Sequence, residues 1–479
     1  MNDGSYNVPM PERYQLRSPM PACAAEAYAW HARPAAFLRL QPPWEVFRDL
    51  SQDGSFAAGK LDVRFRAKCI GPLTRKWHVE FLDFAANREF KYRQVRGPFA
   101  EWTHTHRFIP DTETTSFLEN TVEYRLPFGP LGHAFGAGMV DDRIRAMFSY
   151  RHALLVSDLR RHGLYRDRPR LTIALTGSRG LIGSELAAFL ATGGHRVRRL
   201  VTGSSAKPHF DDGTEWLSWN PVAPVDPAAL DGCDAVIHLA ADGISEGRWN
   251  DRKRKKILES RTIPTRHMAD AITALPPSRR PKVFLCASAV GIYGDRGDEV
   301  LAETASAGSG FLADVCKEWE AAAAPAAVTG VRTVNLRIGA VLTPRDGALG
   351  KQLPAFRAGL GAVLGTGKQW VPWITVHDTV GAIHHCLMTD ALCGPVNLMA
   401  PESVTNRTFT KTLGSVLWRP AFNWLPRPAL KLMFGDIADA VLLSSMRGSP
   451  EKLLATGFKF DHAELESGLR FLLGETVPS

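Results

Sequence analysis

The chain has 479 residues, of which 45% are hydrophobic and 22% are charged, a composition typical of a globular protein with more than one domain. It contains no run of about 20 apolar residues, so no membrane span is expected. The formal net charge of +9 is dispersed and lies in no recognisable nucleic-acid motif, so a solvated surface and attraction of anionic small molecules are expected rather than nucleic-acid binding.

Cysteine usage and the first residues predict the compartment. The seven cysteines are scattered and form no C-x-x-C pair, which is typical of a reducing cytosol and argues against a structural zinc site. No metal is therefore expected. Residues 1–20 lack the apolar segment of a secretory signal and are predicted to form a flexible arm. A cytoplasmic protein is expected.

The first folded segment is predicted to be an antiparallel sheet followed by a long helix. Apolar and charged residues alternate in residues 60–69, and similar runs recur up to residue 127 with turn-forming residues between them. From Phe135 through Met139 to Leu159 the apolar spacing becomes that of an amphipathic helix, which is predicted to end near residue 162. Such an α+β arrangement has room for a cavity.

Residues 21–163 resemble the SRPBCC (START-like, helix-grip) family. The resemblance lies in the order of elements and in the stretches WHARPAAFLRLQPPWE (30–45) and GPFAEWTHTHRF (97–108). It implies an apolar ligand enclosed between sheet and helix, and the alternative is that the aromatic residues only fill a core. His104 and His106 share one strand face and are predicted to be core or surface histidines rather than metal ligands.

A second domain of a different kind is predicted after a basic linker at residues 164–170. Short apolar strands alternate there with helical patterns, which indicates an α/β fold with a Rossmann-type, doubly wound parallel sheet. This domain is placed at residues 171–400. A small helical lobe is expected at residues 401–479.

The sequence TGSRGLIG (176–183) lies directly between the first of these strands and a helix. Gly177 permits a tight turn, Gly180 lets the backbone approach a pyrophosphate, and Gly183 allows the helix to pack closely on the strand. The start of the helix adds N–H groups for the phosphates. Three glycines alone could mark any crowded turn, but the flanking strand and helix predict a nucleotide site.

The end of the second strand indicates which nucleotide is bound. A site for NAD places Asp or Glu there to bind the ribose 2′-hydroxyl, whereas HRVRRLVTGSSAK (195–207) contains no acid. Arg179 in the glycine loop and Lys207 could instead meet a 2′-phosphate. NADP(H) is therefore favoured over NAD(H).

From residue 171 to its end, the chain resembles an atypical, epimerase-like branch of the extended short-chain dehydrogenase/reductase superfamily. A START-like N-terminal domain also occurs in this branch, and the stretch SSMRGSPEKLLATGFKF resembles the short domain of unknown function that ends its members. Besides the glycine loop, the resemblance rests on WNP (219–221), HLAADGISEGRW (238–249), SAVGIYGDRGDE (288–299), FLADVCKEWEAAA (311–323) and GKQWVPWITVHDTVGAI (367–383).

The resemblance implies a set of cofactor-binding residues in the glycine loop, after two strands and on one helix. Thr202 belongs to this set, although relatives often have a basic residue there. The implied residues are Gly177, Ser178, Arg179, Gly180, Leu181, Ile182, Gly183, Thr202, His238, Leu239, Ala240, Ala241 and Lys317.

The catalytic tyrosine of the superfamily is missing. The resemblance implies a Tyr-x-x-x-Lys pair on one helix face, in which the lysine binds the nicotinamide ribose and lowers the pKa of the tyrosine. Lys317 occupies the lysine position, but Ala313 stands where the tyrosine would be. Ser288 lies near the position of the usual serine, which falls on Ala289. The catalytic residues are predicted to be Lys317, Ser288 and Tyr293.

Three interpretations follow from the missing tyrosine. Another acid or base replaces it, solvent supplies the proton, or the protein binds NADP(H) without turnover. The candidate replacements near the motif are Tyr293, Asp295, Asp298, Glu303 and Cys316. Segments that approach the substrate in extended members contain Arg337, Lys368, Gln369, Trp370 and Trp373.

The leading hypothesis is an NADP(H)-dependent oxidoreductase or epimerase that acts on a small-molecule substrate through an atypical active site. The alternative is a non-catalytic NADP(H)-binding sensor, or a carrier of an apolar ligand in the N-terminal cavity. No oligomeric state follows from the sequence.

Overall fold

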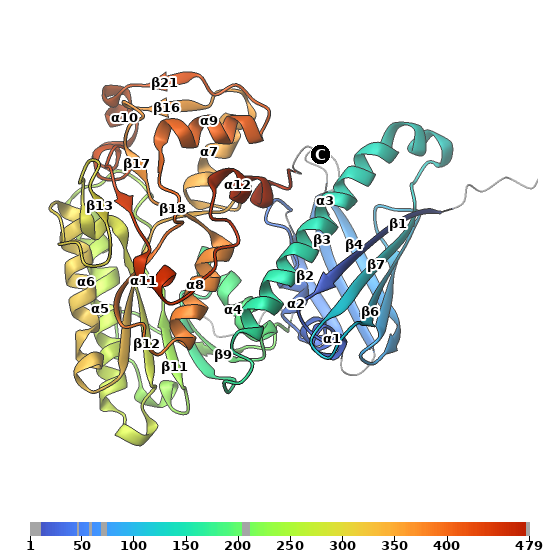
Figure 1. Cartoon of the computed structure of the whole chain (residues 1–479), viewed down its shortest axis with the longest axis horizontal. Helices are drawn as coiled ribbons and strands as arrows, with labels where there is room; N and C mark the ends of the chain where they lie inside the picture. Colours follow the sequence, from blue (N-terminus) through green and yellow to red (C-terminus); the bar gives the residue numbers. More distant parts are fainter. Residues whose placement is uncertain (1–10, 46, 57–59, 69–73, 204–210, 476–479) are drawn as a thin grey trace, which may run out of the picture. The chain divides into compact units, whose positions relative to one another are not determined.

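The structure is a computed structural model that describes residues 11–45, 47–56, 60–68, 74–203 and 211–475 (Figure 1). These residues form two compact units that divide between Arg168 and Pro169, apart from two short segments of the second half. The division falls within the expected linker 164–170. The other predicted domain limits stay predictions.

The N-terminal unit is built on a seven-stranded sheet with the order β1-β7-β6-β5-β4-β3-β2. All of its strand pairs are antiparallel, as predicted, and membership of the helix-grip family stays a prediction. Its elements are β1 (Glu12–Met20), α1 (Ala24–Ala32), α2 (Ala36–Arg39), β2 (Phe47–Ser55), β3 (Lys60–Lys68), β4 (Thr74–Ala85), β5 (Glu89–Arg96), β6 (Glu101–Pro110), β7 (Ser116–Arg125) and α3 (Gly129–Gly163).

Strand β1 shows that the prediction of a flexible arm at residues 1–20 was wrong for residues 12–20. Tyr14 and Met20 are buried on one face of the strand, whereas Arg13 and Arg17 are exposed on the other. This alternation of period two was visible in ERYQLRSPM. Pro19 is tolerated because β1 lies at the edge of the sheet. Residues 1–10 of the predicted arm lie outside the described residues.

The long helix α3 packs on one face of this sheet, and it ends close to the predicted residue 162. Its Ile144 and Phe148 lie in one core cluster with Trp102, Val122 and Tyr124 of β6 and β7. The predicted amphipathic spacing is confirmed for Ile144, Phe148, Leu155 and Leu159, which are buried, and is wrong for Met139, which is exposed. The side chain of Phe135 lies outside the described part of the structure.

A chain of buried polar side chains crosses the core of the N-terminal unit. The Tyr92 hydroxyl pairs with His104 Nδ1, and His104 Nε2 lies 2.6 Å from Asn120 Oδ1. Asn120 Nδ2 then pairs with His152 Nε2, and His152 Nδ1 lies 2.8 Å from Ser18 Oγ. Both predicted histidines of β6 are buried, which confirms that they are core residues.

The second unit is built on a seven-stranded parallel sheet with the order β10-β9-β8-β11-β12-β14-β19. The chain begins in the middle at β8, moves outward to β10 and then returns to β11, so a switch point lies between β8 and β11. The predicted doubly wound parallel sheet is confirmed. Its strands are β8 (Thr172–Thr176), β9 (Arg196–Val201), β10 (Glu215–Ser218), β11 (Ala235–His238), β12 (Val283–Ala289), β14 (Arg332–Ile338) and β19 (Gly394–Leu398).

Helices cover both faces of this sheet. In Figure 1, α5 and α6 lie on one side of β11 and β12, and α4 and α8 lie on the other. Local capping explains where two of them begin, because Asn250 and Thr375 accept hydrogen bonds from Lys253 N and Asp378 N. These helices are α4 (Leu181–Thr192), α5 (Asp251–Ala274), α6 (Phe311–Val328) and α8 (Val376–Met388), whereas α7 (Gly347–Arg357) packs in a separate core cluster with C-terminal residues.

The described C-terminal residues form helices and short strands in the same compact unit. Three two-stranded ladders, β13–β22, β16–β21 and β17–β20, join them to earlier segments, and a fourth, β15–β18, lies within the preceding residues. The helices are α9 (Asn406–Val416), α10 (Arg427–Phe434), α11 (Glu451–Ala455) and α12 (Leu465–Leu473). The short strands are β13 (Val300–Leu301), β15 (Ala340–Leu342), β16 (Ala362–Leu364), β17 (Trp370–Val371), β18 (Trp373–Thr375), β20 (Val404–Thr405), β21 (Asn423–Leu425) and β22 (Arg447–Gly448). Among the described residues, no helix combines the length and apolar character needed to cross a membrane.

The buried histidines couple the stability of the N-terminal unit to pH. Burial lowers the pKa of His31 to about 4 and that of His152 to about 3, and it lowers the pKa of His104 well below the usual value. An unfolded histidine titrates near pH 6.5, so the unfolded chain binds more protons below that pH. The stabilisation is therefore complete above about pH 6.5 and is lost as the pH falls toward the folded-state values.

Calorimetry of the full chain should show the unfolding transition of this unit moving to lower temperature between pH 7 and pH 5. Each such histidine should contribute up to about 1.4 kcal/mol per pH unit. The slope should decrease in His152→Gln and stay unchanged in His133→Gln, whose side chain is exposed on the same helix. A slope in His152→Gln equal to that of the unaltered chain would contradict this expectation.

Candidate functional site

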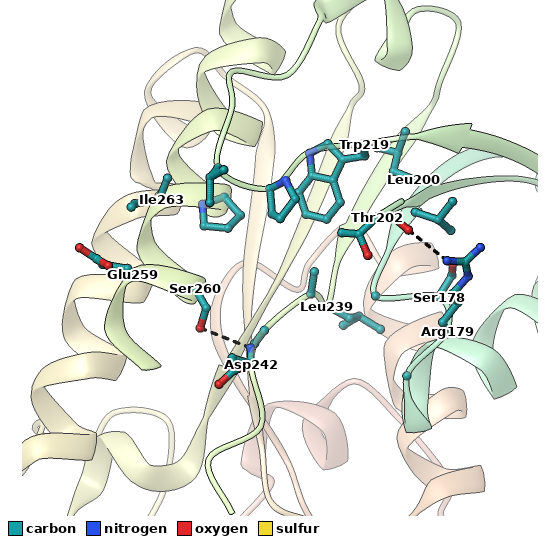
Figure 2. Close-up of a pocket in the computed structure, with 18 of the residues that line it drawn as sticks. Ser178, Arg179, Leu200, Thr202, Trp219, Leu239, Asp242, Glu259, Ser260 and Ile263 are labelled. Atoms are coloured by element: carbon teal, nitrogen blue, oxygen red, sulfur yellow. Dashed lines mark hydrogen bonds between the residues drawn. The ribbon is translucent and has the colours of Figure 1, made fainter. Parts of the chain in front are cut away.

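A pocket of about 580 Å³ lies at the switch point, at the carboxyl ends of β8 and β11 (Figure 2). In open α/β sheets, ligands bind in this place. The structure brings several of the predicted cofactor residues together on its walls, namely Gly177, Ser178, Arg179, Gly180, Thr202, Leu239, Ala240 and Ala241.

The glycine loop can take this form only because two of its positions lack a side chain. Gly177 has a φ of +69°, and a Cβ atom there would lie 2.8 Å from the carbonyl carbon of Leu239. A Cβ atom at Gly183 would lie 2.2 Å from the carbonyl oxygen of Gly177. Leu181, Ile182 and Gly183 form the first turn of α4, so this turn offers backbone N–H groups at the loop.

Thr176, which sequence analysis missed, holds the opposite wall of the pocket. Its Oγ1 accepts hydrogen bonds from the N–H groups of Leu239 and Ala240 at 3.1 and 3.3 Å, and it lies 2.8 Å from His238 Nδ1. His238 is fully buried below the pocket, and burial lowers its pKa to about 4, so the ring is neutral near pH 7. The only sequence signal was a hydroxyl residue at the last position before the glycine loop.

Two arginines surround the end of β9, where a site for NAD would have an acid. Arg179 Nη1 donates to the Thr202 carbonyl at 3.0 Å (Figure 2), and its guanidinium lies 5.2 Å from the centre of the Trp216 ring. Arg199, which sequence analysis missed, donates from Nη1 to the Ser178 carbonyl at 3.1 Å and so supports the glycine loop.

No carboxylate follows β9 directly among the described residues, because the next two positions are Thr202 and Gly203. Lys207, the second residue predicted to meet a 2′-phosphate, lies outside the described residues. The fixed position of Arg179 beside Thr202 is thus the described feature that favours a phosphate at this corner of the pocket.

A second charged group lies on the pocket wall after β11. Asp242 forms ion pairs with Lys253 Nζ at 2.7 Å and Lys256 Nζ at 2.9 Å, and its N–H donates to Ser260 Oγ (Figure 2). Burial acts to raise the pKa of Asp242, but the hydrogen bonds from both lysines outweigh it and the pKa is lowered. Asp242 is therefore ionised at neutral pH. No role for these residues was predicted from the sequence.

Lys317 lies on α6 and does not line the pocket described above. Its Nζ forms an ion pair with Asp314 Oδ1 at 2.6 Å, one turn earlier on an exposed face of the helix. Ala313 is buried in the same helix. The structure thus places the lysine on the predicted helix without showing which group it would bind.

Ser288 and Tyr293 belong to a buried polar network at the carboxyl ends of β12, β14 and β19. Ser288 Oγ donates to Glu320 Oε1 at 2.8 Å, and Arg337 binds both Glu320 oxygens at 2.9 and 3.0 Å. Arg337 Nη1 also donates to the Tyr293 hydroxyl at 2.9 Å, and that hydroxyl donates to Asn397 Oδ1 at 2.7 Å.

The register of the sheet creates this network. Ser288 on β12 is paired with Arg337 on β14, which in turn is paired with Asn397 on β19. Burial raises the pKa of Tyr293, although the hydrogen bond from Arg337 acts in the opposite direction. A buried, neutral tyrosine with both hydrogen bonds satisfied serves in this structure to join the three strand ends.

The other candidates for acid–base chemistry also have structural partners. Burial raises the pKa of Cys316 to about 12, and the thiol packs in an apolar cluster. Asp298 Oδ1 accepts a hydrogen bond from the Trp370 indole at 2.7 Å. Glu303 accepts hydrogen bonds from backbone N–H groups of Asn397 and Lys452. These contacts explain why the side chains are fixed, and none requires a substrate.

The doubly wound sheet and the glycine-lined pocket at its switch point define a dinucleotide-binding protein. Residues 173–396 match the NAD dependent epimerase/dehydratase family, and residues 425–472 match a domain of unknown function, DUF1731. An epimerase family protein of Mycobacterium tuberculosis is 39% identical over 300 residues, which cover 62% of this chain and 96% of the relative. The chain therefore belongs to the NAD dependent epimerase/dehydratase family.

Two solved structures extend the comparison. A nucleoside-diphosphate sugar epimerase from Corynebacterium glutamicum is 29% identical with a TM-score of 0.76, and the match covers 96% of this chain and 90% of that chain. The human epimerase family protein SDR39U1, solved with NADPH, is 30% identical with a TM-score of 0.57, and the match covers 64% of this chain and 100% of that chain. A more distant structure, MoeE5 with UDP-glucuronic acid and NAD, is 18% identical and shares the fold.

The Glu320–Arg337 pair should be important for stability. Glu320→Gln would leave the Arg337 guanidinium buried without its counter-charge, and breaking a buried pair in this way typically costs about 3 kcal/mol or more. Denaturant unfolding should show this loss for Glu320→Gln. Glu318→Gln changes an exposed residue on the same helix, and its free energy of unfolding should lie within about 0.5 kcal/mol of that of the unaltered chain. Equal stability of both variants would contradict the expectation.

Proposed function

We propose that this chain is an NADP(H)-dependent oxidoreductase or epimerase that acts on a small metabolite. The observation that carries the proposal is the pocket at the switch point, where Arg179 replaces the acid expected for NAD. The NADPH in the structure of human SDR39U1, which is 30% identical over its whole length, supports the same cofactor.

The residues present fit a dinucleotide. Side chains at Gly177 or Gly183 would collide with backbone atoms, so the loop leaves its N–H groups and the first turn of α4 to bind a pyrophosphate. Arg179 would bind the 2′-phosphate, and Thr176 and Arg199 keep the two loops in place. Bound NADP(H) would supply or accept the hydride.

The proton that accompanies hydride transfer needs a group other than residue 313, because alanine has no acidic proton. We assign Lys317 to the nicotinamide ribose by the family resemblance, and Ser288 and Tyr293 are retained as catalytic candidates. Since their present hydrogen bonds are internal, catalysis by Ser288 or Tyr293 would require the network around Arg337 to open. Solvent is the alternative source of the proton.

The 2′-phosphate assignment predicts a cofactor preference. NADPH should bind the purified chain at least tenfold more tightly than NADH, as measured by nicotinamide fluorescence. Arg179→Gln should remove most of this preference, because it should weaken the binding of NADPH and have little effect on the binding of NADH. Arg196→Gln removes the same charge at the other end of β9 and should leave both affinities unchanged. A preference that persists in Arg179→Gln would assign the 2′-phosphate to another residue.

The enzymatic proposal predicts that Lys317→Ala abolishes turnover without unfolding the protein. Its ion pair with Asp314 is exposed, so the loss of stability should be below about 1 kcal/mol. With a carbonyl, enone or sugar-nucleotide substrate found by screening, the rate should fall at least 100-fold, while Glu318→Ala keeps normal turnover. Absence of hydride exchange with every substrate class would contradict the proposal.

Tyr293→Phe separates a catalytic from a structural role of the buried network. If Tyr293 moves the proton, turnover should fall and its pH profile should change at unaltered thermal stability. If it only joins the strand ends, stability should fall while the pH profile of turnover keeps its shape.

A second candidate function is favoured by a cavity in the N-terminal unit. The chain would then be a carrier or sensor that holds a small ligand in this unit and binds NADP(H) without turnover. Cofactor binding together with the failure of the substrate screen would favour this candidate.

A further inference from the structure

A cavity of about 280 Å³ lies inside the N-terminal unit, close to the lower size limit of small-molecule sites. It is bordered by strands of the sheet, by the segment around α2, and by Met147 and Arg151 of α3. The wall is rich in aromatic side chains, and the aromatic lining residues are Phe37, Phe47, Phe56, Phe65, Trp77, Phe81, Phe90, Tyr92 and Trp102. Such a wall suits a flat, unsaturated ligand.

The charges on the wall do not cancel. Arg33 and Asp211 have opposite signs, which leaves Arg151 as the net charge of the lining. The lining histidines His31 and His106 are neutral near pH 7, because burial lowers the pKa of each of them. The cavity therefore carries about one positive charge in an otherwise apolar surrounding.

Arg151 is a cation without a carboxylate partner. Its Nε donates to the Leu40 carbonyl at 3.2 Å, its side chain also forms a hydrogen bond with the neutral Tyr92 hydroxyl, and its guanidinium lies 5.5 Å from the centre of the Phe148 ring. The nearby Glu45 is bound through both oxygens to Arg143, at 2.9 and 2.6 Å. Among the described residues, no carboxylate lies within 4.0 Å of the Arg151 guanidinium. Arg151 is partly buried on the cavity wall, and a charge withdrawn from water is costly unless an anion pairs with it.

Hydrogen-bond donors of the same cavity also have no partner among the described residues. They are the indole N–H groups of Trp77 and Trp102, to which His106 Nδ1 can be added as a donor or acceptor. Trp102 and His106 are only 4% and 8% exposed, so bulk water does not satisfy them. A site with unused donors and an unpaired cation is complementary to oxygen acceptors that carry negative charge.

We propose that this cavity binds a planar aromatic carboxylate, with the carboxylate on Arg151 and the ring system among the aromatic side chains. A guanidinium can bind both oxygens of a carboxylate, and an indole N–H, which can only donate, is suited to a further carboxylate or ring oxygen of such a ligand. The proposal names the ligand class of the N-terminal unit and is independent of any reaction at the nucleotide pocket.

Calorimetric titration of the full chain with 2-naphthoate and with 2-naphthamide tests the charge requirement. The two probes have the same shape and differ in charge, so 2-naphthoate should bind at least tenfold more tightly. Decanoate tests the aromatic requirement, since it has the same charge on an aliphatic chain, and it should bind more weakly than 2-naphthoate. Equal affinity of the naphthyl probes, tighter binding of decanoate, or no binding of 2-naphthoate would overturn the proposal.

Arg151→Gln locates the site. The variant should reduce 2-naphthoate affinity at least tenfold and leave 2-naphthamide unchanged, whereas Arg145→Gln, at an exposed position on the same helix, should alter neither. Trp102→Phe is a second variant, for use in case Arg151→Gln does not fold. It keeps an aromatic ring in place but removes an indole N–H, and it should weaken the binding of 2-naphthoate. Unchanged binding of 2-naphthoate in the folded variants would overturn the assignment.

Discussion

The close approach of Gly177 to the peptide between Leu239 and Ala240 is the constraint on which the nucleotide pocket depends. The backbone of two parallel strands meets there at the switch point, where a Cβ atom would lie within 2.9 Å of three backbone atoms. Thr176 closes the same junction by accepting two N–H groups through its hydroxyl. One missing side chain and one hydroxyl thus fix both walls of the pocket, and the apolar strands below them supply the rigid support.

A buried ion pair and its hydrogen bonds hold the carboxyl ends of β12, β14 and β19 together. At three paired positions on β12, β14 and β19 the chain has Ser288, Arg337 and Asn397, and Glu320 from α6 completes their hydrogen bonds. These strand ends are also the region in which the family resemblance would place catalytic groups. The chain therefore joins these strand ends through a buried ion pair and its hydrogen bonds, while Ala313 on the same helix α6 is a buried apolar residue.

The fold was largely predictable because its signals are local. The alternation in β3 and the glycines after β8 can be read within ten residues, and both describe the structure correctly. Strand β1 was missed although the same alternation is present, because its position near the chain end gave it the appearance of an arm. The site was less predictable because its partners are distant in sequence. Ser288 and Glu320 are 32 residues apart, and Tyr293 and Asn397 are 104 apart.

The buried hydrogen bonds that join Tyr92, His104, Asn120, His152 and Ser18 have a fixed order of donors and acceptors. Because the Asn120 amide donates to His152 and accepts from His104, it requires the proton on Nε2 of His104 and on Nδ1 of His152. The two rings are therefore opposite tautomers, set by one amide. Tyr92 lies at one end, on the cavity wall, and Ser18 lies at the other, on the edge strand β1. A ligand oxygen that accepted the Tyr92 proton would leave His104 Nδ1 without a donor, so filling the cavity would remove one buried hydrogen bond from this core while Asn120 kept both tautomers.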